Sequence, residues 1–277
     1  MKSMYGGRCC SFCVSTLVLL AIMFTAAARA QEKVTPLRYM LSNQASKRSV
    51  GSAKLFSGRI CIFHVFANDA QASWSEQEKN EVLGRLEQAC NFLGQQSELH
   101  GHKISFIEEI APTVFYEKRL PTGTFVNPNW TEEVIREASG TGSRELVDRL
   151  RDNHSADNVV VCLHVNKPAL SYNLAYYANV SLAFTAERMV CFSTYPDSRP
   201  TAAATYAHEI LHLFGAGDLY FPYDQDEYRK QLAKRFFPND VMFRVDYNLQ
   251  RLNVGAFTAY RVGWLEHIDP AHKLFED

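Results

Sequence analysis

The chain has 277 residues, of which 47% are apolar, and it carries 29 basic and 30 acidic side chains. This length and composition suit one globular domain or a tightly joined pair of domains. The net charge of −1 argues against nucleic acid as a partner, because binding nucleic acid needs clustered positive charge. The oligomeric state stays open.

The first 30 residues have the parts of a secretory signal peptide. Lys2 and Arg8 precede the apolar run SFCVSTLVLLAIMFTAAA, and an A-x-A step occupies residues 28–30. We expect cleavage after Ala30, which would make the protein exported, either extracellular or periplasmic. The alternative is an uncleaved membrane anchor, but that needs about 20 uninterrupted apolar residues. No later stretch of the sequence is long and apolar enough to span a bilayer.

The mature chain would hold 26 basic against 30 acidic residues, a net charge near −4. It would keep four of the seven cysteines: Cys61, Cys90, Cys162 and Cys191. In an oxidising compartment these can form up to two disulfides in three possible pairings. Each also lies in an apolar stretch, where a buried free thiol is ordinary. The sequence leaves both possibilities open.

Residues 31–56 are mostly polar and rich in serine and basic residues. We interpret them as a mobile leader or a short pro-segment, with a plain N-terminal tail as the alternative. The folded domain is expected over 57–277.

From residue 57 onward, strand-like and helix-like segments alternate. Short apolar or alternating runs predict strands at 59–66, 103–110, 158–165, 180–184 and 188–194. Apolar residues at helical spacing predict helices at 75–93, 143–153, 200–214, 225–236 and 257–265. Ser75 with Glu78 three residues later forms a capping box at the first helix. The order predicts an α+β fold whose N-terminal half is α/β-like, with a mixed, mostly parallel twisted sheet and helices packed on it.

The string HEILHLFGAGD, at 208–218, contains the residues that indicate a metal site. Residues four apart share one face of a helix, so His208 and His212 can offer nitrogen atoms to one metal ion. Glu209 lies about 100° around the helix, where its carboxylate can reach a water on that ion. Gly215 can end the helix in a left-handed conformation, and the turn would bring Asp218 back toward the histidines.

Three protein ligands and one open position are what a catalytic zinc needs. The competing interpretation is a core helix whose histidines are only hydrogen-bonded. The glycine and aspartate at their fixed offsets favour the zinc site, because H-E-x-x-H alone arises by chance far more often than the whole string.

This string, followed by PNDVMF at 238–243, resembles the signature of the metzincin zinc peptidases. The resemblance is closest to the branch with aspartate as third ligand, as in snapalysin, and the immune-inhibitor-A peptidases share the string. It implies one catalytic Zn²⁺ held by His208, His212 and Asp218, with Glu209 as general base and Met242 beneath the metal. It also implies an N-terminal subdomain of about 57–216 and a smaller, mainly helical C-terminal subdomain of about 217–277.

The chain departs from some metzincins at one position. These place a tyrosine two residues after the methionine, where this chain has Arg244. Tyr220, Tyr223 or Tyr247 could stand in as the partner of the oxyanion, and the sequence does not choose among them. His64 and His164 lie in apolar strands, where a histidine is usually packed or hydrogen-bonded rather than a ligand.

The expected function is therefore secreted zinc-dependent metalloendopeptidase, which would hydrolyse peptide bonds of a protein or peptide substrate with a zinc-bound water. The alternative is an exported, metal-stabilised module of metzincin-like fold that binds a peptide or protein without cutting it. The intact Glu209 favours the enzyme, because a module released from catalysis has no need of a carboxylate at that position.

Overall fold

The computed structural model describes residues 51–123, 128–174, 186–220 and 224–276. The predicted signal peptide, residues 31–50 of the leader and the strand expected at 180–184 lie outside them. The strands and α-helices are β1 (Gly58–Asn68), α3 (Glu76–Leu99), β2 (Ile104–Ile110), β3 (Val114–Phe115), α4 (Asn129–Ser139), α5 (Ser143–His154), β4 (Asn158–Pro168), β5 (Tyr172–Leu174), β6 (Glu187–Thr194), α6 (Ala203–Leu213), α7 (Glu227–Phe236) and α8 (Ala256–Arg261). Two short 3-10 helices, Leu249–Arg251 and Pro270–Phe275, complete the C-terminal part.

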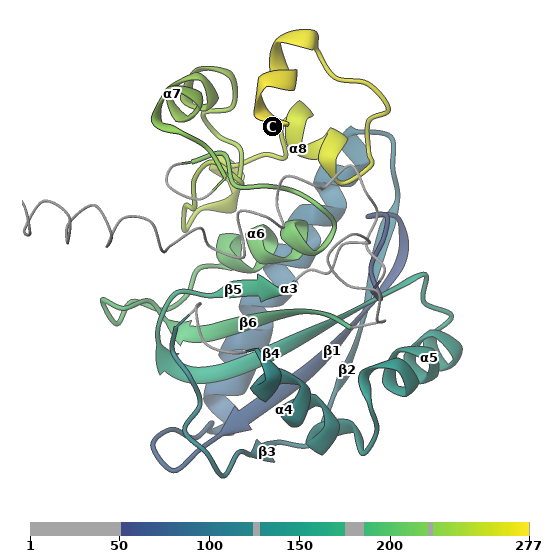
Figure 1. Ribbon diagram of the computed structural model, residues 1–277, viewed down its shortest axis with the longest axis vertical. Coiled ribbons are helices and arrows are strands. Elements are labelled where there is room, and N and C mark those ends of the chain that lie inside the picture. Colours follow the sequence, from purple (N-terminus) through teal and green to yellow (C-terminus); the bar gives the residue numbers. More distant parts are fainter. Residues whose placement is uncertain (1–50, 124–127, 175–185, 221–223, 277) are drawn as a thin grey trace, which may run out of the picture. The chain divides into compact units, whose positions relative to one another are not determined.

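The strands form one sheet with the order β2-β1-β4-β6-β5, and β3 pairs with the far end of β1. Neighbouring strands run parallel, except that β5 is antiparallel to β6. Helix α3 connects β1 to β2, and α4 and α5 precede β4, so helices lie in the crossovers that these parallel pairs require. This mixed, mostly parallel sheet with packed helices confirms the expected fold class (Figure 1).

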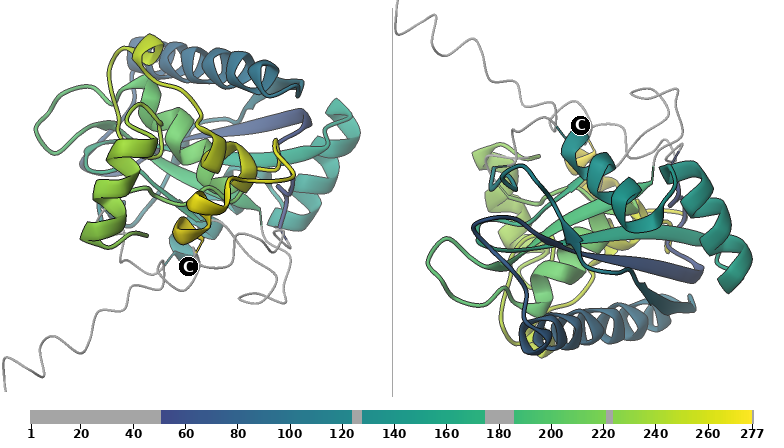
Figure 2. Two further views of the ribbon diagram at one scale, coloured as in Figure 1. Left: turned by 90° about the horizontal axis from the view of Figure 1, so that it is seen from above. Right: turned by 90° about the horizontal axis from the view of Figure 1, so that it is seen from below.

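The sheet is buried on both faces, which explains the nearly continuous apolar sequence of its central strands. Along β1, Ile60, Ile62 and Phe66 belong to a core shared with α3 and α6. The alternate residues Cys61 and Phe63 belong to a second core beneath α4 and α5. Figure 2 shows the sheet between α3 on one side and α4 and α5 on the other.

Some elements differ from those the sequence predicts. Helix α3 begins with the expected capping box at Ser75 but continues six residues beyond 93, to Leu99. The sequence pattern does not predict α4, which contains the β-branched residues Thr131, Val134 and Ile135. These are weak helix formers, and all three are buried, so packing rather than propensity stabilises this helix. Strands β3 and β5 were also missed, because two or three residues are too short to show an alternating pattern.

Residues 51–56 correct the predicted leader. Ser52 and Phe56 are fully buried. The Phe56 ring stacks on Phe214, with centroids 4.3 Å apart, and on Trp264 at 5.3 Å. The Ser52 hydroxyl accepts a hydrogen bond of 2.8 Å from the Glu187 backbone N–H. This segment is therefore part of the folded domain rather than a mobile extension.

The C-terminal part lies on the side of α6 away from the sheet (Figure 1). Helix α7 matches the prediction for 225–236, whereas α8 ends at Arg261, four residues earlier than expected. Gly263 takes a positive φ of 90° just beyond it, which a continued helix would not allow. Trp264 is buried and donates its indole N–H to the Phe56 carbonyl at 2.6 Å.

Two further findings concern the cysteines and the possibility of a membrane-spanning helix. All four cysteines from Cys61 onward are buried free thiols in the structure. Among the described residues, no helix has both the length and the apolar character to cross a membrane.

Candidate metal centre

Helix α6 carries the two histidines and is buried along its whole length. It begins at Ala203, three residues later than predicted, because the preceding chain is still bonded to β6. The Thr201 N–H donates to the Ser193 carbonyl at 3.0 Å, and its hydroxyl donates to the Phe192 carbonyl at 2.7 Å. Pro200 forms an isolated bridge with Thr194 rather than the first helical turn.

The structure brings His208, His212 and Asp218 together. The two Nε2 atoms lie 3.0 Å apart, and Asp218 Oδ1 lies 3.1 Å from the first and 3.2 Å from the second. Two ligands on a tetrahedral zinc with bonds of about 2.0–2.1 Å are separated by about 3.3 Å. The three atoms therefore have nearly the spacing of ligands in a zinc site.

Backbone carbonyls orient both imidazoles. His208 Nδ1 donates to the Val241 carbonyl at 3.0 Å, and His212 Nδ1 donates to the Ala216 carbonyl at 2.8 Å. With the proton on Nδ1, the lone pair of each Nε2 points toward Asp218. Such a second partner is the usual way in which proteins hold a metal-binding histidine.

Gly215 makes the turn that returns the chain to the histidines. Its φ is 103°, a conformation that residues with a side chain rarely adopt. The Asp218 N–H then donates to Asp224 Oδ2 at 2.6 Å, which holds the loop in place. Asp226, in the same acidic run, caps α7 by accepting from the Arg229 N–H, as a helix start requires.

Gly215→Val is expected to weaken zinc binding about 10- to 100-fold, although this residue is not one of the three that meet at the centre. Forcing a β-branched residue into this conformation costs about 1–3 kcal/mol and displaces Asp218. Zinc affinity measured by competition with a chelator tests this. The matched control is Gly140→Val, because Gly140 also has a positive φ of 71° but ends α4 in open space. Equal zinc affinity in both variants would contradict this role of the turn.

The charges at the centre suit a cation. Asp218 is 1% exposed, and no N–H or O–H group of the described residues donates a well-aligned hydrogen bond to its carboxylate oxygens. Burial by itself raises the pKa of Asp218, but the His212 and His208 imidazoles outweigh it and hold the pKa well below its usual value. Burial lowers the pKa of His208, yet the adjacent Asp218 carboxylate raises it overall to about 9. Two imidazoles and a carboxylate whose oxygens accept no well-aligned hydrogen bond from the described residues fit Zn²⁺.

Glu209 lies beside these three residues and is held from the edge of the sheet. Asn173, on β5, donates its side-chain N–H to Glu209 Oε2 at 3.1 Å. The sequence does not indicate Asn173, because it lies 36 residues before Glu209 and only the folded sheet brings β5 to α6. No local pattern marks it.

The segment PNDVMF, which contains Met242, forms a turn that packs beside the same centre. Met242 is fully buried, and its carbonyl accepts from the Leu219 N–H at 2.9 Å. Asp240 holds the turn by accepting from Met242 N–H at 2.8 Å, Gly255 N–H at 2.9 Å and the Thr258 hydroxyl at 2.8 Å. Burial raises the pKa of Asp240 to about 6 even though these three donors lower it.

The structure separates the tyrosines that the sequence could not rank. The Tyr220 ring lies beside His208, with centroids 6.2 Å apart. Tyr247 donates its hydroxyl to the Pro200 carbonyl at 2.9 Å and is half exposed. Arg244 pairs with Asp246. Tyr223 lies outside the described residues.

No protein-family model matches the sequence, and no curated protein matches it. Three solved structures show limited likeness to the fold. Metalloproteinase-II from Bacteroides fragilis is 11% identical with a TM-score of 0.39, over 79% of this chain and 56% of its own length. A zinc-dependent peptidase from Methanocorpusculum labreanum (strain Z) is 12% identical with a TM-score of 0.30, over 73% of this chain and 100% of its own. A chaperone-substrate complex is 16% identical with a TM-score of 0.33, over 59% of this chain and 25% of its own.

Proposed function

We propose that this protein is an exported zinc-dependent metalloendopeptidase. The observation that carries the proposal is the meeting of His208, His212 and Asp218 at ligand spacing, with Glu209 fixed beside them. His208, His212 and Asp218 would hold one zinc ion. When bound, the ion would polarise the scissile carbonyl and activate a water molecule.

Glu209 acts as the general base of the proposed reaction. Its carboxylate takes a proton from the attacking water and transfers it to the leaving nitrogen when the peptide bond breaks. The hydrogen bond from Asn173 fixes one carboxylate oxygen and leaves the other to accept that proton. Glu209 is 4% exposed, so the proton stays within a site that is largely closed to bulk water.

Tyr220 is the favoured partner for the oxyanion among the described tyrosines. Of Tyr220 and Tyr247, only Tyr220 has its ring beside His208, which is one of the proposed ligands. A phenol directed at the developing negative charge stabilises the transition state more than the substrate.

Tyr220→Phe is expected to lower kcat about 100-fold while zinc content and KM stay near those of the wild type. The loss of one oxyanion donor typically has this size. Steady-state kinetics on a fluorescence-quenched peptide measures it. Tyr247→Phe serves as the control, since its hydroxyl is bonded to Pro200 instead. If the two variants lost activity equally, Tyr220 would have no special part in the reaction.

The second candidate is a module that keeps the metal centre and binds a peptide without hydrolysing it. The near-complete burial of the centre favours it, because a substrate carbonyl must reach the ion. A quenched-peptide library incubated with the protein, with and without a chelator, separates the two. The enzyme predicts cleavage that the chelator stops and added zinc restores, whereas the binding module predicts no cleavage in either arm.

The substrate class would be protein or peptide, and export would place the reaction outside the cytoplasm. Zinc is preferred for two imidazoles and one carboxylate, although the same ligands accept cobalt or manganese.

A further inference from the structure

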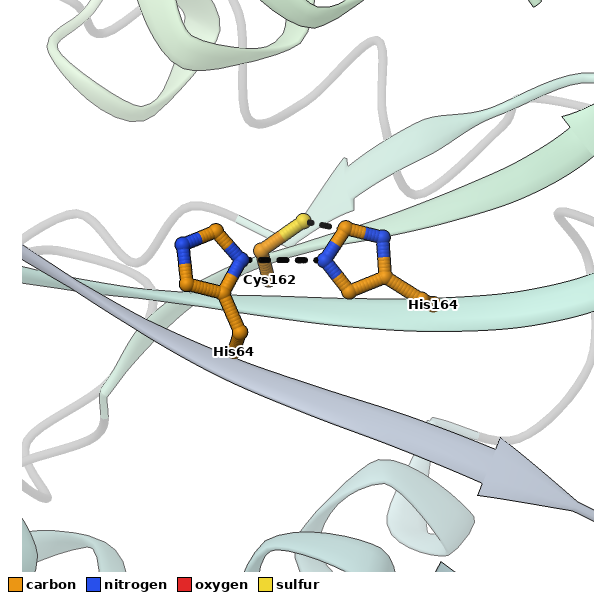
Figure 3. Close-up of side chains that lie close together, drawn as sticks. All are labelled: His64, Cys162 and His164. Atoms are coloured by element: carbon orange, nitrogen blue, oxygen red, sulfur yellow. Dashed lines mark hydrogen bonds between the residues drawn. The ribbon is translucent and has the colours of Figure 1, made fainter. Parts of the chain in front are cut away.

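A second group of metal-binding side chains lies within the sheet. His64 is on β1, and Cys162 and His164 are on β4. His64 and Cys162 are register partners on adjacent strands, and His164 follows Cys162 by two residues, so all three side chains project from the same face. Figure 3 shows the two rings edge to edge, with the Cys162 sulfur beside the gap between them.

The ligand atoms of this group are already close together. His64 Nδ1 lies 3.0 Å from His164 Nε2, and Cys162 Sγ lies 3.8 Å from His164 Nδ1. One ligand atom from each residue lies within 4.8 Å of the others, and all three residues are fully buried. Cys191, on β6, places its sulfur 3.7 Å from that of Cys162. None of these residues belongs to the centre on α6.

Packing alone leaves this group incompletely satisfied. His64 Nε2 is buried and has no hydrogen-bond partner among the described residues, and its nearest carboxylate oxygen, Glu108 Oε2, is 3.7 Å away. A buried polar nitrogen without a partner is uncommon and calls for an explanation.

We propose that His64, Cys162 and His164 form a second, buried site for a thiophilic d¹⁰ metal ion, zinc or copper(I). Thiolate and imidazole are the ligands that these two ions share. Binding replaces the Cys162 thiol proton by the metal, and the proton is released to solvent. Bound at Nδ1, His64 would present its Nε2–H to Glu108, the kind of carboxylate partner that often supports a metal-bound histidine.

Cys191 distinguishes the two ions. One thiolate neutralises copper(I), and three ligands are enough for it. Zinc needs a second thiolate for neutrality in a buried site and takes four ligands. Two thiolates on a tetrahedral zinc with bonds of about 2.3 Å are about 3.8 Å apart. The observed 3.7 Å between Cys162 and Cys191 therefore suits zinc with all four residues.

The decisive experiment uses the full chain, with cobalt(II) as the probe for zinc and copper(I) added without oxygen. The proposed ligands on α6 include no sulfur, so a thiolate-to-metal absorption band has to come from a cysteine site. We expect the wild type to show the band with at least one ion, Cys162→Ala to lose it, and Cys61→Ala to keep it. Cys61 is the matched control, because it is buried on the opposite face of the same sheet. The band of the wild type is informative even if Cys162→Ala fails to fold.

The remaining variants separate the ions and the two sites. Cys191→Ala should lose the band with cobalt but keep it with copper(I). His212→Ala should keep the band while losing the ion on α6, so failure of the proposed peptidase leaves this test intact. The proposal is overturned if neither ion gives a band in the wild type, if Cys162→Ala retains it, or if peptide mapping by mass spectrometry shows a Cys162–Cys191 disulfide in the isolated protein.

Discussion

Glu209→Gln is expected to bind zinc as tightly as the wild type and to lower kcat about 100- to 10,000-fold. The range is that of a general base removed from an otherwise intact site. Glutamine matches glutamate in size and can still accept the hydrogen bond from Asn173, so the geometry should persist. It cannot take a proton from the attacking water. Turnover of a quenched peptide and metal analysis of the same sample measure both parts.

The matched control is Glu133→Gln, because Glu133 is exposed on α4 and pairs with Lys118 far from the reaction chemistry. This variant should retain full activity. Peptide hydrolysis at the wild-type rate in folded, zinc-loaded Glu209→Gln would show that another group acts as the base.

Asp218→Ala should lose most zinc affinity and, with it, activity. The carboxylate lies within 3.2 Å of both Nε2 atoms and is 1% exposed, so its loss leaves two imidazoles and no charged ligand. Removal of a residue that only hydrogen-bonds a metal ligand lowers metal affinity about 10- to 100-fold. The loss of zinc affinity in Asp218→Ala should be larger than this. Competition with a chromogenic chelator measures the affinity, and circular dichroism checks that the variant is folded.

Asp226→Asn is the control in the same acidic segment. Asparagine is an equally good helix cap, so α7 should persist and zinc affinity should not change. If Asp218→Ala bound zinc as tightly as the wild type, Asp218 would not be the third ligand.

The arrangement of the proposed ligands was predictable where it depends on local geometry. The helical period sets His208 four residues from His212, and one glycine turn returns Asp218 to them. All of this happens within eleven residues. The long-range partners were not predictable. Asn173 reaches Glu209 only through the pairing of β5 with β6, and Asp240 meets Gly255 only when the chain between them folds back on itself.

The incorrect predictions about the fold have a similar cause. Phe56 looks like the end of a polar leader until Phe214 and Trp264, more than 150 residues later, pack against it. The pairing of His64 with His164 depends on the register of β1 against β4, which no local pattern encodes. Each residue alone favours a packed core histidine, and only their juxtaposition suggests a ligand pair.

The measurement that tests the central claim most directly is diffraction across the zinc absorption edge from crystals of the zinc-loaded protein. The proposed centre predicts an anomalous peak about 2.0–2.1 Å from His208 Nε2 and His212 Nε2 and about 2.0–2.2 Å from one Asp218 oxygen. Glu209 should lie outside the ligand set, held by Asn173. The absence of a peak at this position, or a peak bound by Glu209 in place of Asp218, would contradict the proposed centre and the function argued from it.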